Sequence, residues 1–269
     1  MSGLILRLAA PMQAWGERSA FTEIRDSAPF PTRSGLIGLL ASAEGRPRHQ
    51  VDLTRYQDLR ITVRVDRPGE RLEDYHTVGG GQPKSRTAAT AGGSNKGAAV
   101  ITRRHYLADA VFTVAITTPT HQLAEELTDA LRRPYWAPYL GRRSCPPDQP
   151  FLLAGPIDDP DSELRTRVPL SRPAPIQQPA WDTNDPGTEA EPSATVPVEF
   201  LIETDTATVT PGATLLETND NPLDFSPHSR SYGARLLQRR TEQLPATLLG
   251  PQRTLMKRLI DYADGSHRA

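Results

Sequence analysis

Two segments of the chain alternate between apolar and polar side chains with a period of two residues. In residues 59–66, leucine, isoleucine and valine alternate with charged or hydroxyl-bearing side chains. In residues 111–117 the same period sets Phe112, Val114 and Ile116 against a second set that contains two threonines. This period is typical of a β-strand, and a polar set of positions indicates a face in contact with water. We therefore expect two strands of a sheet, the first with one wet face.

Two further segments have the spacing of helices. Residues 36–43 carry small and aliphatic side chains at helical spacing, and Thr32 can cap the free amides at their start. Residues 121–133 have leucines at spacing four, acids on the outer face and two arginines at the end, which suits the helix dipole. Short apolar runs at residues 4–9 and 151–154 indicate a first and a last strand.

The order of these elements is strand, helix, strand, strand, helix, strand. It is the β-α-β-β-α-β order of the ferredoxin-like fold, which belongs to the α+β class. We expect residues 1–156 to form this domain. Residues 157–269 are rich in proline, which opposes long helices, so we expect an irregular, β-rich C-terminal extension there.

About 45 residues separate the second and third strands, where a tight turn would suffice. Tyr75–Val78 and Ala99–Leu107 can pair as strands, and the residues between them are rich in glycine. We therefore predict a long thumb hairpin over residues 74–107, with a polar, basic tip that is flexible without a ligand.

Composition excludes several classes of protein. The chain of 269 residues is 37% hydrophobic and 23% charged, as in ordinary soluble proteins. Its single cysteine, Cys145, rules out a disulfide framework and a thiolate metal cluster. No apolar run is long enough to cross a bilayer, and no phosphate-binding loop of the Walker type is present. We expect a cytoplasmic protein without cofactor, metal site or membrane contact.

The net charge of −1 hides an uneven distribution of charge. Residues 75–108 and residues 130–147 contain no acid but several arginines and lysines, whereas residues 173–229 contain ten acids and no Lys or Arg. Acid-free basic segments attract phosphate groups. These two segments therefore point to a nucleic acid, although a solvated surface with chance clustering gives the same pattern.

Three groups of residues are candidates for binding RNA. At the predicted start of the first helix, Arg33 and Ser34 join free amides that suit an anion, or form an ordinary capped helix. In the loop Tyr139–Pro147, glycine can let a phosphate approach and arginines can neutralise it, unless the loop is a plain surface turn. The candidates in that loop are Gly141, Arg142, Arg143 and Ser144.

The predicted hairpin is the third group. Aromatic side chains interleaved with basic ones are typical of a binding site for single-stranded nucleic acid, although a solvated loop without a ligand is the alternative. The candidates are Tyr75, His76, Lys84, Arg86, Arg103, Arg104 and Tyr106. In a fourth segment, residues 225–235, Arg230, Tyr232 and Arg235 can either join the RNA surface or pair with the acids before them.

Signals of catalysis are weak. The six histidines form no close pair of metal ligands, and no spacing of Ser, His and Asp is distinctive. One alternative remains, a metal-independent endoribonuclease that cuts RNA. It would use Tyr75, His76 and Lys84, with His76 as general acid or base.

Four segments together resemble the CasD family, the subunits that hold the guide RNA in type I-E CRISPR Cascade complexes. The matching segments are Leu6–Gly16, Phe30–Leu40, Tyr139–Pro147 and Asn221–Arg235. They occur in the order of the family and span most of the chain.

The resemblance implies a ferredoxin-like, RRM-related RAMP domain with a thumb hairpin. It implies a non-catalytic subunit that binds the 5′ handle of the CRISPR RNA and caps one end of the backbone filament in antiviral defence. Expected partners are that RNA, the Cascade backbone subunit, the Cascade large subunit and, through the guide, target DNA. The role of the proline-rich segment 169–197 stays open.

Overall fold

The computed structural model describes residues 1–16, 23–79, 83–87, 99–172, 194–205, 208–226 and 230–266, without the side chains of Lys84 and Ser266. Most of the glycine-rich tip of the predicted hairpin, residues 80–82 and 88–98, lies outside the described residues, as does most of the proline-rich segment. The same holds for residues 227–229 within the fourth candidate segment.

Within these residues, seven strands form one sheet in which every neighbouring pair is antiparallel. In spatial order they are β10 (Thr214–Asp224), β11 (Ser231–Pro245), β9 (Thr195–Thr204), β4 (Arg60–Arg67), β7 (Val111–Thr118), β1 (Ser2–Ala9) and β8 (Leu152–Ile157). The chain is thus an α+β protein with antiparallel sheets, as its sequence indicated.

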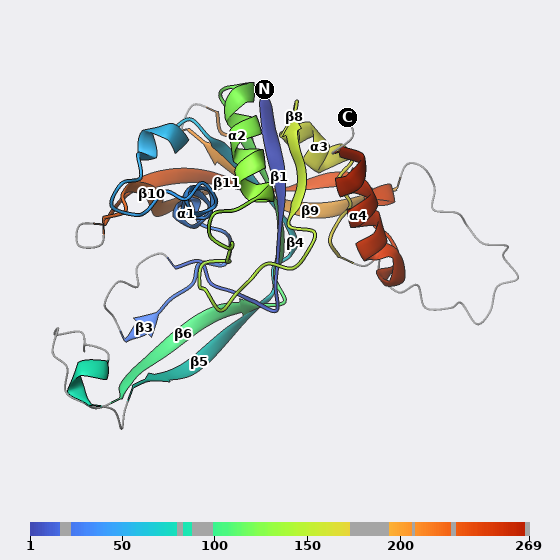
Figure 1. The fold of residues 1–269 in the computed structure, drawn as a ribbon. Coiled ribbons are helices and arrows are strands. Elements are labelled where there is room, and N and C mark those ends of the chain that lie inside the picture. Colours follow the sequence, from blue (N-terminus) through green and yellow to red (C-terminus); the bar gives the residue numbers. More distant parts are fainter. Residues whose placement is uncertain are drawn as a thin grey trace, which may run out of the picture.

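Helices cover both faces of this sheet (Figure 1). On one face, α1 (Arg33–Ala43) and α2 (His121–Arg132) bury an apolar core against β1, β4 and β7. On the other face, α3 (Pro160–Thr166) and α4 (Leu255–Ser266) bury a second core. Short 3-10 turns are Leu53–Tyr56, Lys84–Arg86, Ala246–Leu248 and Gln252–Thr254. The sheet is therefore the middle one of three layers.

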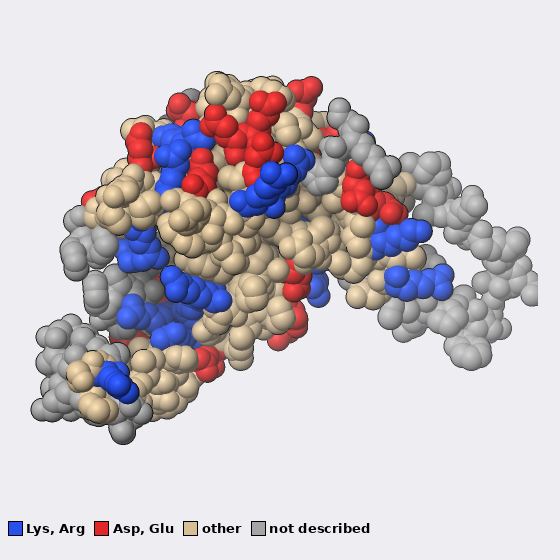
Figure 2. All heavy atoms as spheres, viewed as in Figure 1, with Lys and Arg blue, Asp and Glu red and all other residues tan. Residues whose placement is uncertain are grey.

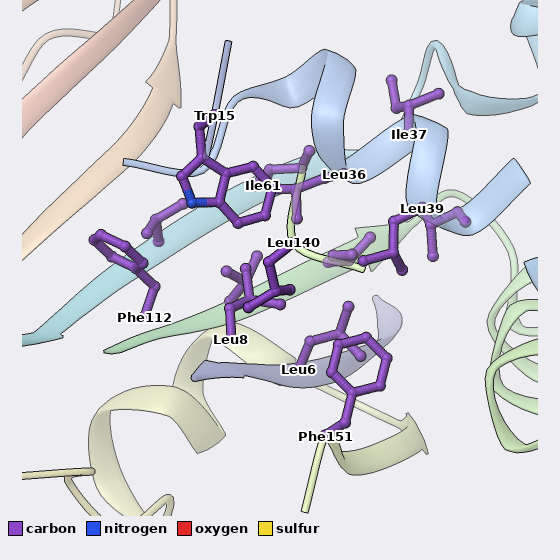
Figure 3. Close-up of a cluster of buried hydrophobic side chains, with 14 of the residues drawn as sticks. Leu6, Leu8, Trp15, Leu36, Ile37, Leu39, Ile61, Phe112, Leu140 and Phe151 are labelled. Atoms are coloured by element: carbon purple, nitrogen blue, oxygen red, sulfur yellow. The ribbon is translucent and has the colours of Figure 1, made fainter. Parts of the chain in front are cut away.

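The two predicted helices are confirmed, and the reasons are local. The Thr32 side chain accepts a hydrogen bond from the Gly35 amide, so α1 begins at its expected cap. Thr120 accepts one from the Leu123 amide and caps α2 in the same way. Apolar residues of both helices belong to one buried core, part of which Figure 3 shows with Leu36, Ile37 and Leu39 of α1.

The expectation of a wet face on β4 was wrong. Arg64 and Asp66 are fully buried and form a bidentate ion pair. Arg64 also donates to the carbonyl oxygens of Leu164, Val168 and Pro169. Segments about 100 residues further along the chain supply this cover, so local periodicity carried no sign of it. The paired charges satisfy each other in place of water.

The C-terminal strands continue the same sheet, because β9 pairs with β4 from Thr62↔Ile202 to Val65↔Glu199. This pairing joins the two parts expected at residues 1–156 and 157–269, and that division stays a prediction. The helices α3 and α4 were not expected, because proline content pointed away from helix in this part of the chain.

A smaller sheet projects from the body (Figure 1). Its strands β5 (Glu70–Val78) and β6 (Val100–Ala108) pair antiparallel along their length. The short strands β2 (Met12–Gln13) and β3 (Ile24–Arg25) flank the other edge of β6, β3 in parallel. In the described part of the chain, no helix has the length and apolar character needed to span a membrane.

Candidate nucleic-acid interface

The loop Leu140–Cys145 is held on the body of the protein by its two buried ends. The amide of Leu140 donates to the Cys145 carbonyl oxygen at 2.7 Å, and the Leu140 carbonyl oxygen accepts from Ala14 at 3.1 Å. Leu140 and Cys145 are buried, whereas Gly141, Arg143 and Ser144 are exposed between them. The loop therefore displays three of its four candidate residues on a fixed backbone.

Gly141 has a structural role in place of the expected one of letting a phosphate approach the backbone. Its φ of +82° favours glycine, and a Cβ there would lie 1.4 Å from the carbonyl oxygen of Ala14. The missing side chain thus lets the loop approach the protein's own backbone. We correct the expected role of Gly141 in phosphate approach on this ground.

Arg142 is half-buried and only partly satisfied. Its guanidinium lies 4.4 Å from the centre of the Tyr106 ring, and its Nη2 donates to the carbonyl oxygen of Arg25 at 3.2 Å. Its Nη1 is buried and has no hydrogen-bond partner among the described residues. A buried donor without an acceptor is unfavourable, so the described part of the protein leaves the Arg142 guanidinium incompletely satisfied.

Arg25 and Arg104 complete an arginine cluster with Arg142. Arg25 of β3 pairs in register with Arg104 of β6. Burial lowers the pKa of Arg25, and the positive charges of Arg104 and Arg142 lower it further. Three like charges held together repel one another, and an approaching phosphate would relieve that repulsion. Figure 2 shows Lys and Arg side chains gathered over the region where Figure 1 places β3 and β6.

Sequence reasoning missed Arg25. Glu23 and Asp26 flank it, so it lies outside the acid-free segments that selected the other candidates. Its neighbour on the adjacent strand is 79 positions away in the chain (Arg25↔Arg104). Only the pairing of β3 with β6 reveals its place.

The register of the hairpin divides its candidates between two faces, since residues opposite each other in an antiparallel pair point to the same side. Tyr75 is opposite Arg103, and His76 is opposite Thr102. Tyr75 and Arg103 therefore share one face, while His76, Arg104 and Tyr106 share the other with the arginine cluster. The structure does not bring all five residues into one surface.

The remaining hairpin candidates lie further out. Arg86 is exposed in the 3-10 turn Lys84–Arg86, which Figure 1 draws at the outer end of the hairpin. The side chain of Lys84 lies outside the description.

Arg33 is a correction to the predicted phosphate site at the start of α1. It is buried and donates all five of its guanidinium N–H groups to the protein itself. The acceptors are the carbonyl oxygens of Tyr56, Gln57 and Leu59 and the side chains of Asn221 and Glu203. An arginine with every donor engaged has none left for a phosphate.

The amide end of α1 is occupied as well. The Arg33 amide donates to the carboxylate of Asp220 at 2.7 Å, so the protein supplies its own anion there. Ser34 is half-buried in the first turn of the helix. Arg33 is therefore not part of the candidate interface, whereas the predicted role of Ser34 stays a prediction.

Arg235 forms structural pairs, one of the two alternatives for its segment. It binds the carboxylates of Asp220 and Glu203. Burial alone would raise the pKa of Asp220, but the hydrogen bonds and charge of Arg235 outweigh burial and hold this pKa below its ordinary value. Arg230 and Tyr232 are exposed at the start of β11.

Two residues of the nuclease alternative, Tyr75 and His76, do not share a face of the hairpin. Tyr75 and His76 are neighbours on one strand and so point to opposite faces. His76 lies 3.4 Å from Asp74, with both side chains partly exposed. Among the described residues, no group of three or more His, Cys, Asp and Glu side chains could hold a metal ion.

The fold and this surface define an α+β protein with an arginine cluster along one face of a projecting hairpin. The chain belongs to the family of CRISPR-associated proteins (Cas_Cas5), whose model matches residues 3–236. Over 182 residues, which are 63% of this chain and 78% of its relative, it is 38% identical to the CRISPR system Cascade subunit CasD of Escherichia coli strain K12.

Two solved structures resemble the whole molecule. A chain of a CRISPR RNA-guided surveillance complex has a TM-score of 0.80 and 45% identity, with 98% of this chain and 100% of that chain covered. The crystal structure of a Cas protein has a TM-score of 0.59 and 29% identity, covering 92% and 97%.

Proposed function

We propose that this chain is a subunit of a Cascade-type CRISPR surveillance complex, that it holds the 5′ handle of the CRISPR RNA, and that it does not cut RNA. The arginine cluster of Arg25, Arg104 and Arg142 is the observation that carries the proposal, because it concentrates positive charge around an unsatisfied donor. Similarity to CasD and to a surveillance complex supports the same reading.

The proposal assigns a role to each part of the surface. Arg143 and Ser144 extend the cluster along the exposed loop, and His76 extends it along the hairpin. We infer that β1, α1, β4, β7, α2 and β8 form a ferredoxin-like unit, and that the β5–β6 hairpin is its thumb. The strand order β4-β7-β1-β8 supports this inference.

The proposed partners are those that a subunit of such a complex requires. They are the CRISPR RNA, the Cascade backbone subunit, the Cascade large subunit and, through the guide, target DNA. The complex would act in the cytoplasm, where the chain would cap the end of the backbone filament at the 5′ handle.

The test is binding of a labelled handle RNA across a salt series, with Arg25→Gln, Arg104→Gln and Arg142→Gln compared with the natural protein. Each substitution should weaken RNA binding by about 1.5–3 kcal/mol, the usual contribution of a hydrogen bond to a charged group. Each should also reduce the slope of log K against log salt by about 0.7, the value for one contact to a single strand.

The matched control is Arg239→Gln, since Arg239 is exposed on β11 and pairs with Glu199. If the three cluster variants bind as tightly as this control, the arginine cluster is not the RNA site. The same RNA kept in EDTA and analysed on a denaturing gel should stay intact, and cleavage at a single position would make the chain an endoribonuclease.

A further inference from the structure

The hairpin face opposite the arginine cluster carries a patch of exposed apolar side chains, hereafter the apolar patch: Ile24, Tyr75 and Ile101. Their exposed fractions are 54%, 64% and 46%. Exposed side chains of this size are common singly, but a contiguous group of them marks an interaction surface. The question is whether these three are contiguous.

The strand register shows that they are. Tyr75 of β5 and Ile24 of β3 both lie beside Arg103 of β6, one on each side of it. Ile101 lies two residues along β6 from Arg103 and therefore on the same face. At diagonal positions it is within reach of both Tyr75 and Ile24. The three apolar side chains thus surround one arginine on a three-stranded surface.

The chemistry of the apolar patch suits a protein better than RNA. Isoleucine offers neither charge for a phosphate nor a flat ring for a base, whereas interface centres are apolar and aromatic with occasional arginine. Arg103 is largely exposed, and its charge is offset only in part by Glu73 at 3.6 Å. A carboxylate on a partner would complete that pair.

We propose that the apolar patch docks a neighbouring protein subunit through an apolar surface that presents a carboxylate to Arg103, while the opposite face of the hairpin holds RNA. This inference rests on the proposed function, because it takes the chain to be one subunit of a larger assembly. It assigns Tyr75 and Arg103 to a protein contact instead of the RNA contact expected for them. Three side chains would form only the centre of the contact, since stable interfaces bury about 800 Å² on each partner.

The first arm of the test is incorporation of Ile101→Glu into the complex, with the other subunits and the guide RNA present. We expect incorporation to fall at least tenfold while the affinity of the isolated chain for handle RNA stays unchanged. The matched control is Ile260→Glu, because Ile260 is 45% exposed on α4. Unchanged melting temperatures of both variants show that the fold is intact.

The second arm uses the photoreactive amino acid p-benzoylphenylalanine at neighbouring positions of β5. In place of Tyr75 it should crosslink to a protein subunit, and in place of His76 it should crosslink to RNA. The two positions differ by one residue and so sample the two faces of one strand.

Four results would overturn the proposal: normal incorporation of Ile101→Glu, a parallel loss of its RNA affinity, an RNA adduct from position 75, or a crosslink from position 75 to a second copy of this chain. Failure of the proposed function is a separate result. It would show as unchanged RNA binding by Arg142→Gln, whatever Ile101→Glu does.

Discussion

Gly141 lies where the loop Leu140–Cys145 comes closest to the body of the protein, so its replacement directly tests how that loop is held. Gly141→Ala would place a methyl group on the carbonyl oxygen of Ala14 and keep a left-handed backbone. We expect a loss of about 3 kcal/mol in the free energy of unfolding, from backbone strain and overpacking together. Urea denaturation measures it.

Gly212 is the matched control for this prediction. Its φ is also +82°, but a Cβ there meets nothing within 4 Å. Gly212→Ala should therefore lower the free energy of unfolding only through the strain of a left-handed alanine, by about 1 kcal/mol. Equal losses for the two variants would mean that the contact with Ala14 does not hold the loop.

Arg33 gives a second prediction at the scale of single residues. Arg33→Ala removes one partner of a buried ion pair and leaves Glu203 less satisfied, so we expect a loss of about 3–5 kcal/mol in stability. Arg239→Ala breaks an exposed pair and should cost less than about 1 kcal/mol. Similar urea midpoints for the two variants would contradict the buried role of Arg33.

Whether a candidate residue could be assigned correctly from sequence depended on how far away its partners lie in the chain. Arg142 and Arg143 could be selected as candidates from a short acid-free segment, and the loop that displays them is closed by a hydrogen bond between its own ends, Leu140 and Cys145. Arg33 was misassigned, because Asp220 and Glu203 occupy its site from 187 and 170 residues away. No local pattern could have shown that these acids return to the start of α1.

At the scale of elements, α4 is held on the sheet by one apolar stripe. Leu259 is fully buried beside β8, while the next residue, Ile260, is about half exposed. Leu259→Ala should cost about 2–5 kcal/mol, because it leaves a cavity in the second core. Ile260→Ala should change stability by less than about 1 kcal/mol. Thermal unfolding of the two variants compares adjacent positions of one helix, and a larger loss from Ile260→Ala would reverse the assignment of its faces.

The elements that sequence predicted well are those whose signal is local. The cap at Thr32 and the helical spacing of apolar residues identified α1, and leucines at spacing four identified α2. Alternation identified β4 and β7, but it gave β4 the wrong exposure, since α3 and the chain after it cover the polar face. The second core, built from α3, α4 and the far end of the sheet, depends on packing between distant segments.

At the scale of the whole molecule, a buried charge network ties the C-terminal strands to α1. Asp220 on β10 accepts hydrogen bonds from the Arg33 amide and from Arg235 on β11. Glu203 on β9 binds both arginines. The network therefore links the part before residue 157 with the part after it, and acid should weaken the fold through it.

The pH dependence of this network is predictable because the pKa of Asp220 is lowered in the folded protein from an ordinary value of 3.8. A carboxylate with a depressed folded pKa contributes its full stability above pH 3.8 and loses it as pH falls through the folded pKa.

Urea denaturation of the natural protein and of Asp220→Asn should show a difference in the free energy of unfolding of about 3 kcal/mol at pH 7. Below pH 3.8 that difference should narrow by about 1.4 kcal/mol per pH unit until Asp220 is protonated in both states. Glu242, whose pKa is also lowered through Arg165, is present in both proteins and cancels from the comparison. A difference that stays constant from pH 6 to pH 3 would mean that Asp220 does not link the two parts of the chain as an ion.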